Sequence, residues 1–525
     1  MLSAIGLLAL ASAAMRWPNL RDLPIFGDEA VFLRLARLVR SDSVANLWIS
    51  LRVPNAPLHT WLLALSLPLS TDPVQAGRIL SVILGSLLAP ALAWTVWRTA
   101  VAFRWARDRS AVAAFAAGAL TALSPFLVFA HRLVRLEALF AFEVALCAGL
   151  SVELARRARS GESLAVRTMA FGALMGATML TRQAVSYPLW LLPVIAFALI
   201  PGKTGAKRLA ISLGAASAVG AALWIPMLLA PAWPDLAARL FYLSVARPPL
   251  SIAGRLTLLA RNATLALESF WKYLTPPVAL AAIVTIGFLA VRHRRLFALF
   301  TAWELLLLLP TVLFAVDYFP RYALPAALPL IAAAGFGFGA AWSRARVEAV
   351  ALFVAVLVWG AVEIARGEGD WRSWHLLPLD RQQFVSGWSA GLASERAGAF
   401  FAERAQSTPI TVVVPRVSGN PSDAIWLHLA GKKNVRLVYA NDFLRLPALQ
   451  VRGDVWIDAP TAAVAPDRPA YFVSQDPVFL GRQGWAPASG VVFPLNPGAR
   501  LVARFENPPD ERGSVESAVA LYLLR

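Results

Sequence analysis

The sequence predicts an α-helical multi-pass membrane protein with a C-terminal α/β extracytoplasmic domain. Of its 525 residues, 58% are hydrophobic and only 15% are charged, whereas soluble proteins average about 25% charged residues. Mean hydropathy is +0.60. Apolar runs of membrane-spanning length recur up to residue 365, and beyond residue 366 the runs shorten to strand length. A wholly soluble enzyme and a disordered chain are both excluded.

The apolar runs define the predicted membrane core, residues 1–365. A bilayer core of about 30 Å requires roughly 20 apolar residues per helix. About eleven runs meet or approach this length, and they lie near 2–16, 76–100, 111–130, 138–155, 166–181, 185–200, 208–230, 272–291, 296–316, 322–341 and 346–365. The first run is short, and it is either a truncated helix or a signal sequence without a basic start.

Lysines and arginines in short loops predict the orientation of these helices. Five basic loops fall on alternate connections, namely Arg104–Arg109, Arg156–Arg159, Lys203–Arg208, Arg292–Arg295 and Arg344–Arg346. We assign them to the cytoplasm. The other connections, including 17–75, 131–137, 182–184, 231–271 and 317–321, and the chain after residue 366 then face outward. The protein is expected in the cell's inner membrane with an extracytoplasmic C-terminal domain.

The charge and cysteine content exclude other function classes. Forty-nine basic and 31 acidic residues give a net charge of +18. This charge lies in loops between membrane runs, where it serves topology, so we expect no nucleic-acid partner. The single cysteine, Cys147, excludes an intramolecular disulfide and a cysteine-based zinc site.

The predicted C-terminal domain covers residues 366–525 and alternates helices with strands. Helices are expected at Ser394–Ala405 and Ser422–Leu429. Strands are expected at Ile410–Val414, Val435–Tyr439, Asp454–Ile457, Ala470–Val473, Arg500–Phe505 and Ala518–Leu523. The pattern predicts a small α/β layer. It contains no glycine-rich phosphate loop, so we expect an accessory domain that caps the membrane part or contacts an acceptor.

The first outer loop begins with two acids, Asp28 and Glu29, at the start of an amphipathic helix. We expect this helix to lie in the membrane interface, with its arginines contacting lipid headgroups. Pro54 and Pro57 then interrupt helical structure. His59 opens a short apolar run ending at Leu69, which is too short to span and is therefore re-entrant or interfacial.

Other outward positions carry further charges. Arg135 and Glu137 stand two residues apart where a membrane helix begins, a spacing that suits a local ion pair. Glu143 lies deeper, where a lone carboxylate is costly unless it has a partner. Arg182 occupies a tight outer connection, and Arg321 and Tyr322 link two later helices. Acids can act as general bases and arginines can neutralise a phosphate, so these positions together suit a phosphorylated lipid substrate.

Several of these short motifs resemble the multi-pass C-type glycosyltransferases that use lipid-phosphate sugars. The chain is most similar to their protein O-mannosyltransferase and aminoarabinose-transferase group. The resemblance covers about residues 1–365. It rests on Gly27–Ala30, Ala56–Leu58, Arg78, Arg135–Glu137, Leu180–Arg182 and Pro320–Pro325, taken in this order and on one side of the membrane.

The resemblance implies an inverting sugar transfer from a polyprenyl-phosphate donor to a protein, lipid or glycan acceptor. It makes Asp28 the general base, with Glu29 beside it, and Glu137 the acid of the second loop. Substrate-binding roles fall to His59, Arg78, Arg135, Arg182, Arg321 and Tyr322. No cofactor is certain; a divalent cation held by His59 and Glu137 is one option. Two alternatives stay open, a transporter or flippase of lipid-linked sugars and a non-enzymatic envelope assembly protein.

Overall fold

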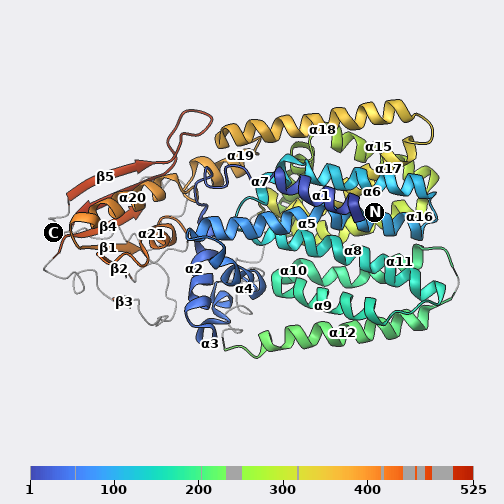
Figure 1. Cartoon of the computed structure of the whole chain (residues 1–525), viewed down its shortest axis with the longest axis horizontal. Helices are drawn as coiled ribbons and strands as arrows, with labels where there is room; N and C mark the ends of the chain where they lie inside the picture. The colour runs from blue at the N-terminus through green and yellow to red at the C-terminus, as the bar shows by residue number, and fades with distance from the viewer. Residues whose placement is uncertain are drawn as a thin grey trace. The chain divides into compact units, whose positions relative to one another are not determined.

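The computed structural model describes residues 2–53, 55–202, 204–231, 251–315, 318–415, 419–440, 456–457, 468–475 and 500–523 (Figure 1). The chain forms two compact units. The helical unit comprises Met1–Leu20, Leu38–Leu69 and Ala76–Leu377, and the sheet unit comprises Arg21–Arg37, Ser70–Gln75 and Pro378–Arg525. The sheet unit therefore combines the C-terminal region with two pieces of the predicted first outer loop. The predicted division of the chain at residue 366 stays a prediction.

Helices account for most of the first 377 residues. The longest is α5 (Pro73–Ala102), which at 1.5 Å per residue extends about 45 Å. The other α-helices of this region are α1 (Leu2–Ala14), α2 (Gly27–Ser41), α3 (Ser43–Asn46), α4 (Pro57–Ser66), α6 (Arg107–Ala122), α7 (Pro125–Ala130), α8 (Leu136–Ser160), α9 (Ala165–Thr181), α10 (Gln183–Ser186), α11 (Leu192–Leu199), α12 (Ala206–Leu228), α14 (Ile252–Tyr273), α15 (Pro276–Arg292), α16 (Arg294–Phe314), α17 (Ala327–Ala341) and α18 (Arg346–Gly369).

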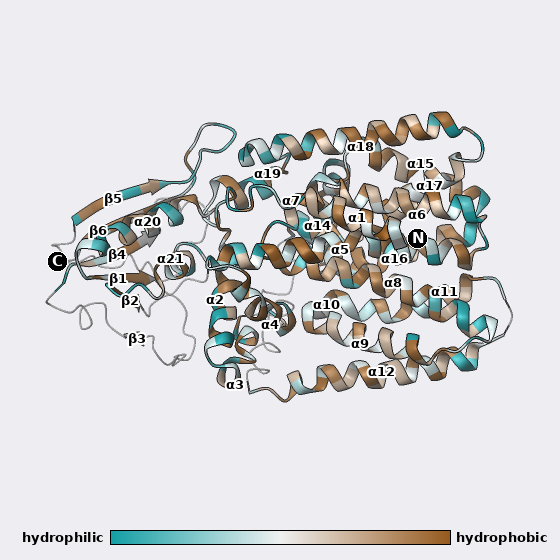
Figure 2. Cartoon of the chain, in the orientation of Figure 1, coloured by the Kyte–Doolittle hydropathy of each residue, from teal (hydrophilic) through white to brown (hydrophobic). Residues whose placement is uncertain are grey.

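Shorter 3-10 segments join these helices. They are η1 (Ile49–Arg52), η2 (Leu67–Leu69), η3 (Tyr187–Leu191), η4 (Pro320–Ala326) and η5 (Trp371–Ser373). All eleven predicted apolar runs are helical over most of their length, and the predicted short helix after Pro57 is α4. Hydrophobic residues dominate the helices of this unit (Figure 2).

Among the described residues, six helices are long and apolar enough to cross a membrane. The pair α14 and α15, bent by 113° at its junction, raises this number to seven if it counts as one span. The chain is a multi-pass membrane protein. The predicted number of about eleven spans stays a prediction, because α1 and α11, which belong to two of the predicted runs, are shorter than a bilayer requires.

Small residues bring the membrane helices close together. Gly335 and Gly339 of α17 face Ala113 and Ala117 of α6, and an added Cβ at Gly335 would lie 2.7 Å from the Ala113 carbonyl oxygen. Gly172 of α9 likewise meets the backbone of α12. Because lipid supplies no hydrophobic drive between helices, such close backbone approach is a main source of their packing energy.

One helix departs from the prediction. Residues 231–271 were expected to form an outer connection, but the described part from residue 251 contains α14, which Ser251 caps through a hydrogen bond from the Gly254 amide. Arg255 and Arg261 lower its mean hydropathy, so α14 alone is not apolar enough to count as a membrane span. Its apolar face nevertheless packs: Ala266 is buried with Tyr318 and Ala323.

The sheet unit contains a six-stranded sheet in the order β3-β2-β1-β4-β6-β5. Its strands are β1 (Ile410–Pro415), β2 (Val435–Ala440), β3 (Trp456–Ile457), β4 (Ala470–Gln475), β5 (Arg500–Glu506) and β6 (Ala518–Leu523). The first four strands are parallel, and β6 pairs antiparallel with β4 and β5. Helices α20 (Leu392–Ser407) and α21 (Ser422–Leu429) pack on the strands (Figure 1). The short helix α19 (Pro378–Arg381) and the π-helical turn η6 (Gln382–Ser386) precede them.

The predicted α/β layer is confirmed element by element. Both predicted helices and all six predicted strands are present, with ends that differ by a few residues. Asp454 and Val455, predicted to begin the third strand, lie outside the described residues. Continuous apolar runs explain the agreement for the central strand: residues 410–414 of β1 are all buried, because strands flank β1 on both sides and helices pack on the sheet.

Candidate functional site

An ion pair at the start of α8 forms the centre of the candidate site. Arg135 is the extended N-cap residue of α8, and its side chain folds back onto Glu137. Its Nε lies 3.1 Å from Oε2 and its Nη2 lies 3.0 Å from Oε1. This bidentate geometry is the strongest form of an arginine–carboxylate contact. Both residues are buried, so the predicted local ion pair is confirmed.

A second guanidinium group reaches the same carboxylate from η4. Arg321 Nε lies 3.8 Å from Glu137 Oε1, and the guanidinium group also lies over the Phe319 ring, 4.2 Å from its centroid. Pro320 begins η4 and Pro325 lies inside it, which fixes the backbone around Arg321. Glu137 is thus shared between Arg135 and Arg321, two arginines that are 186 residues apart in sequence.

Arg182 and Tyr322 complete this cluster. Arg182 is the C-cap of α9, and its guanidinium carbon lies 4.7 Å from the centroid of the Tyr322 ring. Arg321 lies 5.4 Å from the same ring. Tyr322 therefore lies within cation–π range of both arginines. Within the described part of the chain, Arg182 has no carboxylate within ion-pair distance. We call Arg135, Glu137, Arg182, Arg321 and Tyr322 the arginine cluster.

The arginine cluster has an excess of positive charge. Arg135, Arg182 and Arg321 are all close enough to Glu137 to act electrostatically on its carboxylate. The five side chains of the cluster include three guanidinium groups and only one carboxylate. A cluster with more guanidinium groups than carboxylates suits an anionic ligand such as a phosphate.

His59 lies beside the cluster. It follows Pro57 in the first turn of α4 and is 1% exposed. Burial lowers the pKa of His59 to about 4, the charge on Glu137 opposes this change, and the charge on Arg135 adds to it. The imidazole is therefore neutral at physiological pH, and it can act as a hydrogen-bond donor or acceptor rather than a cation.

Two other charged positions hold helices together. Arg78 is fully buried on α5, and its Nη1 donates to the Leu20 carbonyl at 2.5 Å. Glu143, one and a half turns after Glu137 on α8, accepts a hydrogen bond of 3.0 Å from the Thr181 hydroxyl. Thr181 directly precedes Arg182, so this bond ties the end of α9 to α8. The sequence suggested a partner for Glu143 but gave no sign that it would be Thr181.

The predicted acids of the first loop lie on α2, within the sheet unit. Glu29 is fully buried, and its Oε2 accepts the Phe26 amide at 2.8 Å, so its carboxylate closes the N-terminus of α2. Asp28 is partly exposed. The structure thus gives Glu29 a local backbone role that the sequence did not assign to it.

The expected lipid contacts of the α2 arginines need correction for Arg34 and Arg37. Arg34 Nη1 lies 2.7 Å from Asp423 Oδ1, and the guanidinium carbons of Arg34 and Arg37 lie 5.8 and 5.2 Å from the centroid of the Trp426 ring. These partners belong to α21. A partly buried ion pair replaced the expected headgroup contact because Asp423, 389 residues away in sequence, folds against this helix.

Metal-ligating residues do not gather in the described part of the chain. No group of three His, Cys, Asp or Glu side chains there could hold a metal ion. His59 and Glu137, predicted as one option for a divalent cation, lie close together but beside arginine charges that disfavour a cation. We derive no step that requires a metal.

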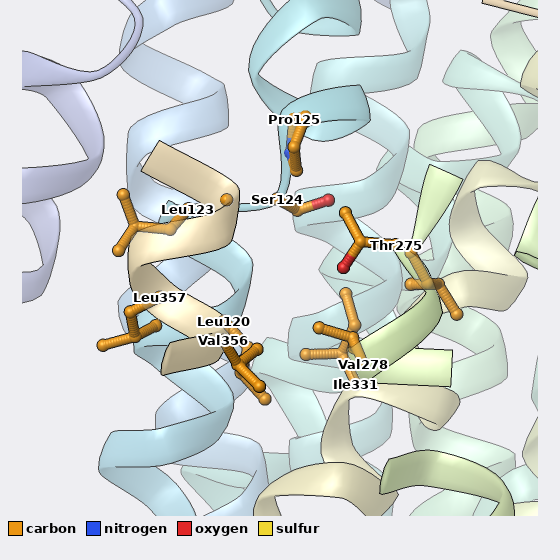
Figure 3. A pocket seen from close by; sticks show the side chains of 11 residues that line it. Leu120, Leu123, Ser124, Pro125, Thr275, Val278, Ile331, Val356 and Leu357 are labelled. Atoms are coloured by element: carbon orange, nitrogen blue, oxygen red, sulfur yellow. The ribbon is translucent and has the colours of Figure 1, made fainter. Parts of the chain in front are cut away.

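Two small apolar pockets adjoin each other, and the second of them lies next to η4. The first is lined by residues of α6, α7, α15, α17 and α18, including Leu123, Pro125, Thr275 and Ile331 (Figure 3). The second includes Phe126, Tyr273, Pro320 and Ala323, and Ser124 and Leu274 line both pockets. Pro320 and Ala323 flank Arg321 and Tyr322 in sequence. An apolar surface therefore begins beside the arginine cluster.

Comparison with known proteins identifies the fold. No family model matches the chain, and no curated protein matches it in sequence. Among solved structures, ArnT from Cupriavidus metallidurans bound to undecaprenyl phosphate is similar, with a TM-score of 0.54 and 16% identity over 98% of this chain and 97% of that chain. The apo state of the same enzyme gives a TM-score of 0.54 with 15% identity, over 98% of this chain and 97% of that chain.

A more distant neighbour is the Archaeoglobus fulgidus oligosaccharyltransferase in complex with zinc and sulfate. Its TM-score is 0.51 at 12% identity, and the match covers 81% of this chain and 61% of that chain. Identities this low show the fold alone. The chain has the fold of the C-type glycosyltransferases, which confirms the predicted resemblance at the level of fold.

Proposed function

We propose that this protein transfers a sugar from a polyprenyl-phosphate-linked donor to an acceptor on the extracytoplasmic face of the inner membrane. The observation that carries this proposal is the arginine cluster, three arginines around one carboxylate beside an apolar pocket, in a chain with the ArnT fold. ArnT was solved with undecaprenyl phosphate bound, which supports the same chemical class of lipid phosphate here.

The arginine cluster suits the phosphate of the donor. Arg182 and Arg321 flank Tyr322, and guanidinium groups bind phosphate oxygens through paired N–H donors. The Arg135 side chain is already engaged by Glu137, which holds it in place. The apolar side chains that line the pocket at η4 suit contact with the part of the lipid tail next to the phosphate. Together these features favour an amphiphilic lipid phosphate over a water-soluble nucleotide sugar.

The proposed reaction is an inverting displacement at the anomeric carbon. An acceptor hydroxyl or amine attacks this carbon, the bond from carbon to the phosphate oxygen breaks, and Asp28 takes the acceptor proton. The leaving polyprenyl phosphate gains a negative charge, which Arg182 and Arg321 stabilise. The assignment of Asp28 as base comes from the sequence resemblance. Glu29 is less suited to this role because its carboxylate caps α2.

The test compares Asp28→Asn with Asp22→Asn in membranes that receive a labelled polyprenyl-phosphate sugar. Asp22 is an exposed acid of the same segment and provides a matched control. We expect the Asp28 variant to lose transfer while keeping donor binding, and the Asp22 variant to match the wild type. Wild-type turnover in Asp28→Asn would remove Asp28 as the base. Donor translocation in reconstituted vesicles without any transfer product would favour the transporter alternative.

A further inference from the structure

We propose that the C-terminal α/β domain positions the loop that carries Asp28. The sheet unit holds the residues just before Asp28 through backbone and side-chain contacts, and it holds the following helix through a separate ion pair. This inference rests on the proposed role of Asp28 and extends it. The domain becomes a part of the catalytic apparatus in place of the accessory cap that the sequence predicted.

Each residue of the segment Ile25–Gly27 is attached to the domain. The Ile25 amide donates to Glu395 Oε1 at 3.0 Å, and the Ile25 carbonyl accepts from Asn420 Nδ2 at 3.2 Å. The Phe26 ring lies 4.7 Å from the Phe384 ring, centroid to centroid. The Gly27 amide donates to the Ser389 carbonyl at 2.9 Å. Three consecutive residues are thus fixed immediately before Asp28.

Glycines make this close approach feasible. The backbone of Gly391 lies against the Ile25 carbonyl so tightly that a Cβ there would overlap its oxygen. Gly419, with a φ of 92°, lies against Gly27, with only 3.3 Å between an added Cβ and the Gly27 carbonyl oxygen. A side chain at either glycine would push the Asp28 segment away.

The helix that follows Asp28 has its own attachment. Asp423 accepts the Gly419 amide through Oδ2 at 2.7 Å and pairs with Arg34 through Oδ1 at 2.7 Å. One carboxylate therefore links the loop after β1 to α2. Arg34 lies six residues beyond Asp28 on α2, and its ion pair is partly buried, with Asp423 3% exposed at its side chain. Pairs of this kind fix an orientation more than they add stability.

The place of attachment in the sheet supports a functional role. The order of the parallel strands reverses between β1 and β4, and doubly wound sheets bind ligands outside the carboxyl ends of strands at such a reversal. Gly419 and Asn420 follow β1 at this edge, and they contact Ile25 and Gly27. The chain's own Asp28 loop therefore occupies the place where a related domain would bind a ligand.

A designed disulfide tests the attachment without reference to activity. The Cβ that a side chain at Gly27 would carry lies 3.7 Å from the Ser389 Cβ, a separation typical of disulfides. The native Cys147 is buried and does not compete. We expect Gly27→Cys with Ser389→Cys to cross-link fully under mild oxidant in the full-length protein, and to keep transfer activity when oxidised. Failure to cross-link, or loss of transfer that a reductant restores, would overturn the proposal.

A second experiment tests positioning. Arg34→Gln and Asn420→Asp should raise amide hydrogen exchange in residues 25–31 and lower kcat at least about tenfold, with donor KM nearly unchanged. Arg34→Lys should keep part of the wild-type protection from exchange and part of the wild-type kcat. Arg40→Gln, an exposed arginine of the same helix, is the control and should change neither. Unchanged exchange and kcat in Arg34→Gln would contradict the proposal.

The two proposals fail in different ways. If the wild type transfers no sugar, the proposed function fails, and the cross-link and the exchange still decide whether the domain holds this loop. If the wild type transfers sugar but the cross-link does not form and the Arg34→Gln variant is unchanged, only the positioning role fails.

Discussion

In the arginine cluster, the single carboxylate of Glu137 faces three guanidinium groups. Its bidentate bond fixes Arg135, and a longer contact of 3.8 Å joins its carboxylate to Arg321. A carboxylate in this place therefore orients the arginines and also lowers the electrostatic repulsion among their positive charges. The chemistry of the site depends on this balance more than on any single residue.

Arg182 provides the clearest test of phosphate binding. Its side chain contacts aromatic rings and, within the described chain, no carboxylate, so replacing it breaks no ion pair there. We expect Arg182→Gln to lower kcat/KM by at least about 10²-fold, which corresponds to about 3 kcal/mol of transition-state stabilisation. Arg182→Lys should retain part of the activity, because it keeps the charge without the planar fork.

The measurement is transfer from a polyprenyl-phosphate sugar at varied donor concentration. Arg295→Gln, which changes an exposed arginine in the first turn of α16, is the control and should resemble the wild type. Equal kcat/KM in Arg182→Gln and Arg295→Gln would show that Arg182 does not stabilise the leaving phosphate.

His59 makes stability depend on pH in the acidic range. Burial lowers its pKa to about 4, below the ordinary 6.5, so the unfolded chain binds the proton more readily than the folded chain. Stability from this residue is complete above pH 6.5 and is lost as the pH falls toward 4, by about 3 kcal/mol in total. Thermal unfolding in detergent from pH 7.5 to 4 should show this loss, and His59→Gln should reduce it. The same pH dependence in His59→Gln would exclude His59 as its source.

At the scale of elements, the contact between α6 and α17 depends on residues without side-chain bulk. A Cβ added at Gly335 would lie 2.7 Å from the Ala113 carbonyl oxygen, and one added at Gly339 would lie 2.7 Å from the Arg109 carbonyl oxygen. Gly335→Leu should therefore separate the helices and lower the unfolding temperature in detergent by several degrees. Gly287→Ala is the matched control, because nothing lies within 4 Å of its Cβ position. A Gly335→Leu variant as stable as Gly287→Ala would show that this contact adds little.

The elements were largely predictable because their signals are local. Apolar length marked the membrane helices, and short alternating runs between turn residues marked the strands. α14 was missed because Arg255 and Arg261 reduce its hydropathy, while its packing partners Tyr318 and Ala323 are more than 50 residues away.

The same distinction holds for the site. The Arg135–Glu137 pair follows from a spacing of two residues. By contrast, the Arg34–Asp423 pair and the Glu143–Thr181 bond could not be predicted, since only the tertiary fold brings these residues together.

At the scale of the whole molecule, the basic loops meet at one end of the helical unit. The Trp105 and His293 rings lie 5.5 Å apart, which joins the first and fourth basic loops. Gly339, just before the fifth loop, lies against the Arg109 carbonyl. Arg159, in the second basic loop, donates to the carbonyl of Gly202, next to the third. Arg98, near the end of the helix before the first loop, and Arg156, in the second loop, both bond Glu153. The five basic loops thus lie at the end of the helical unit that the positive-inside rule would place in the cytoplasm.

Cysteine labelling tests this sidedness in intact cells. Ser514, in the turn before β6, and Ser343, between α17 and α18, are both exposed, and the native Cys147 is buried and should stay silent. With the basic end in the cytoplasm, a membrane-impermeant maleimide should label Ser514→Cys in spheroplasts. Ser343→Cys should react only after the membrane is permeabilised. The reverse order would place the C-terminal domain in the cytoplasm, where the proposed extracytoplasmic transfer could not occur.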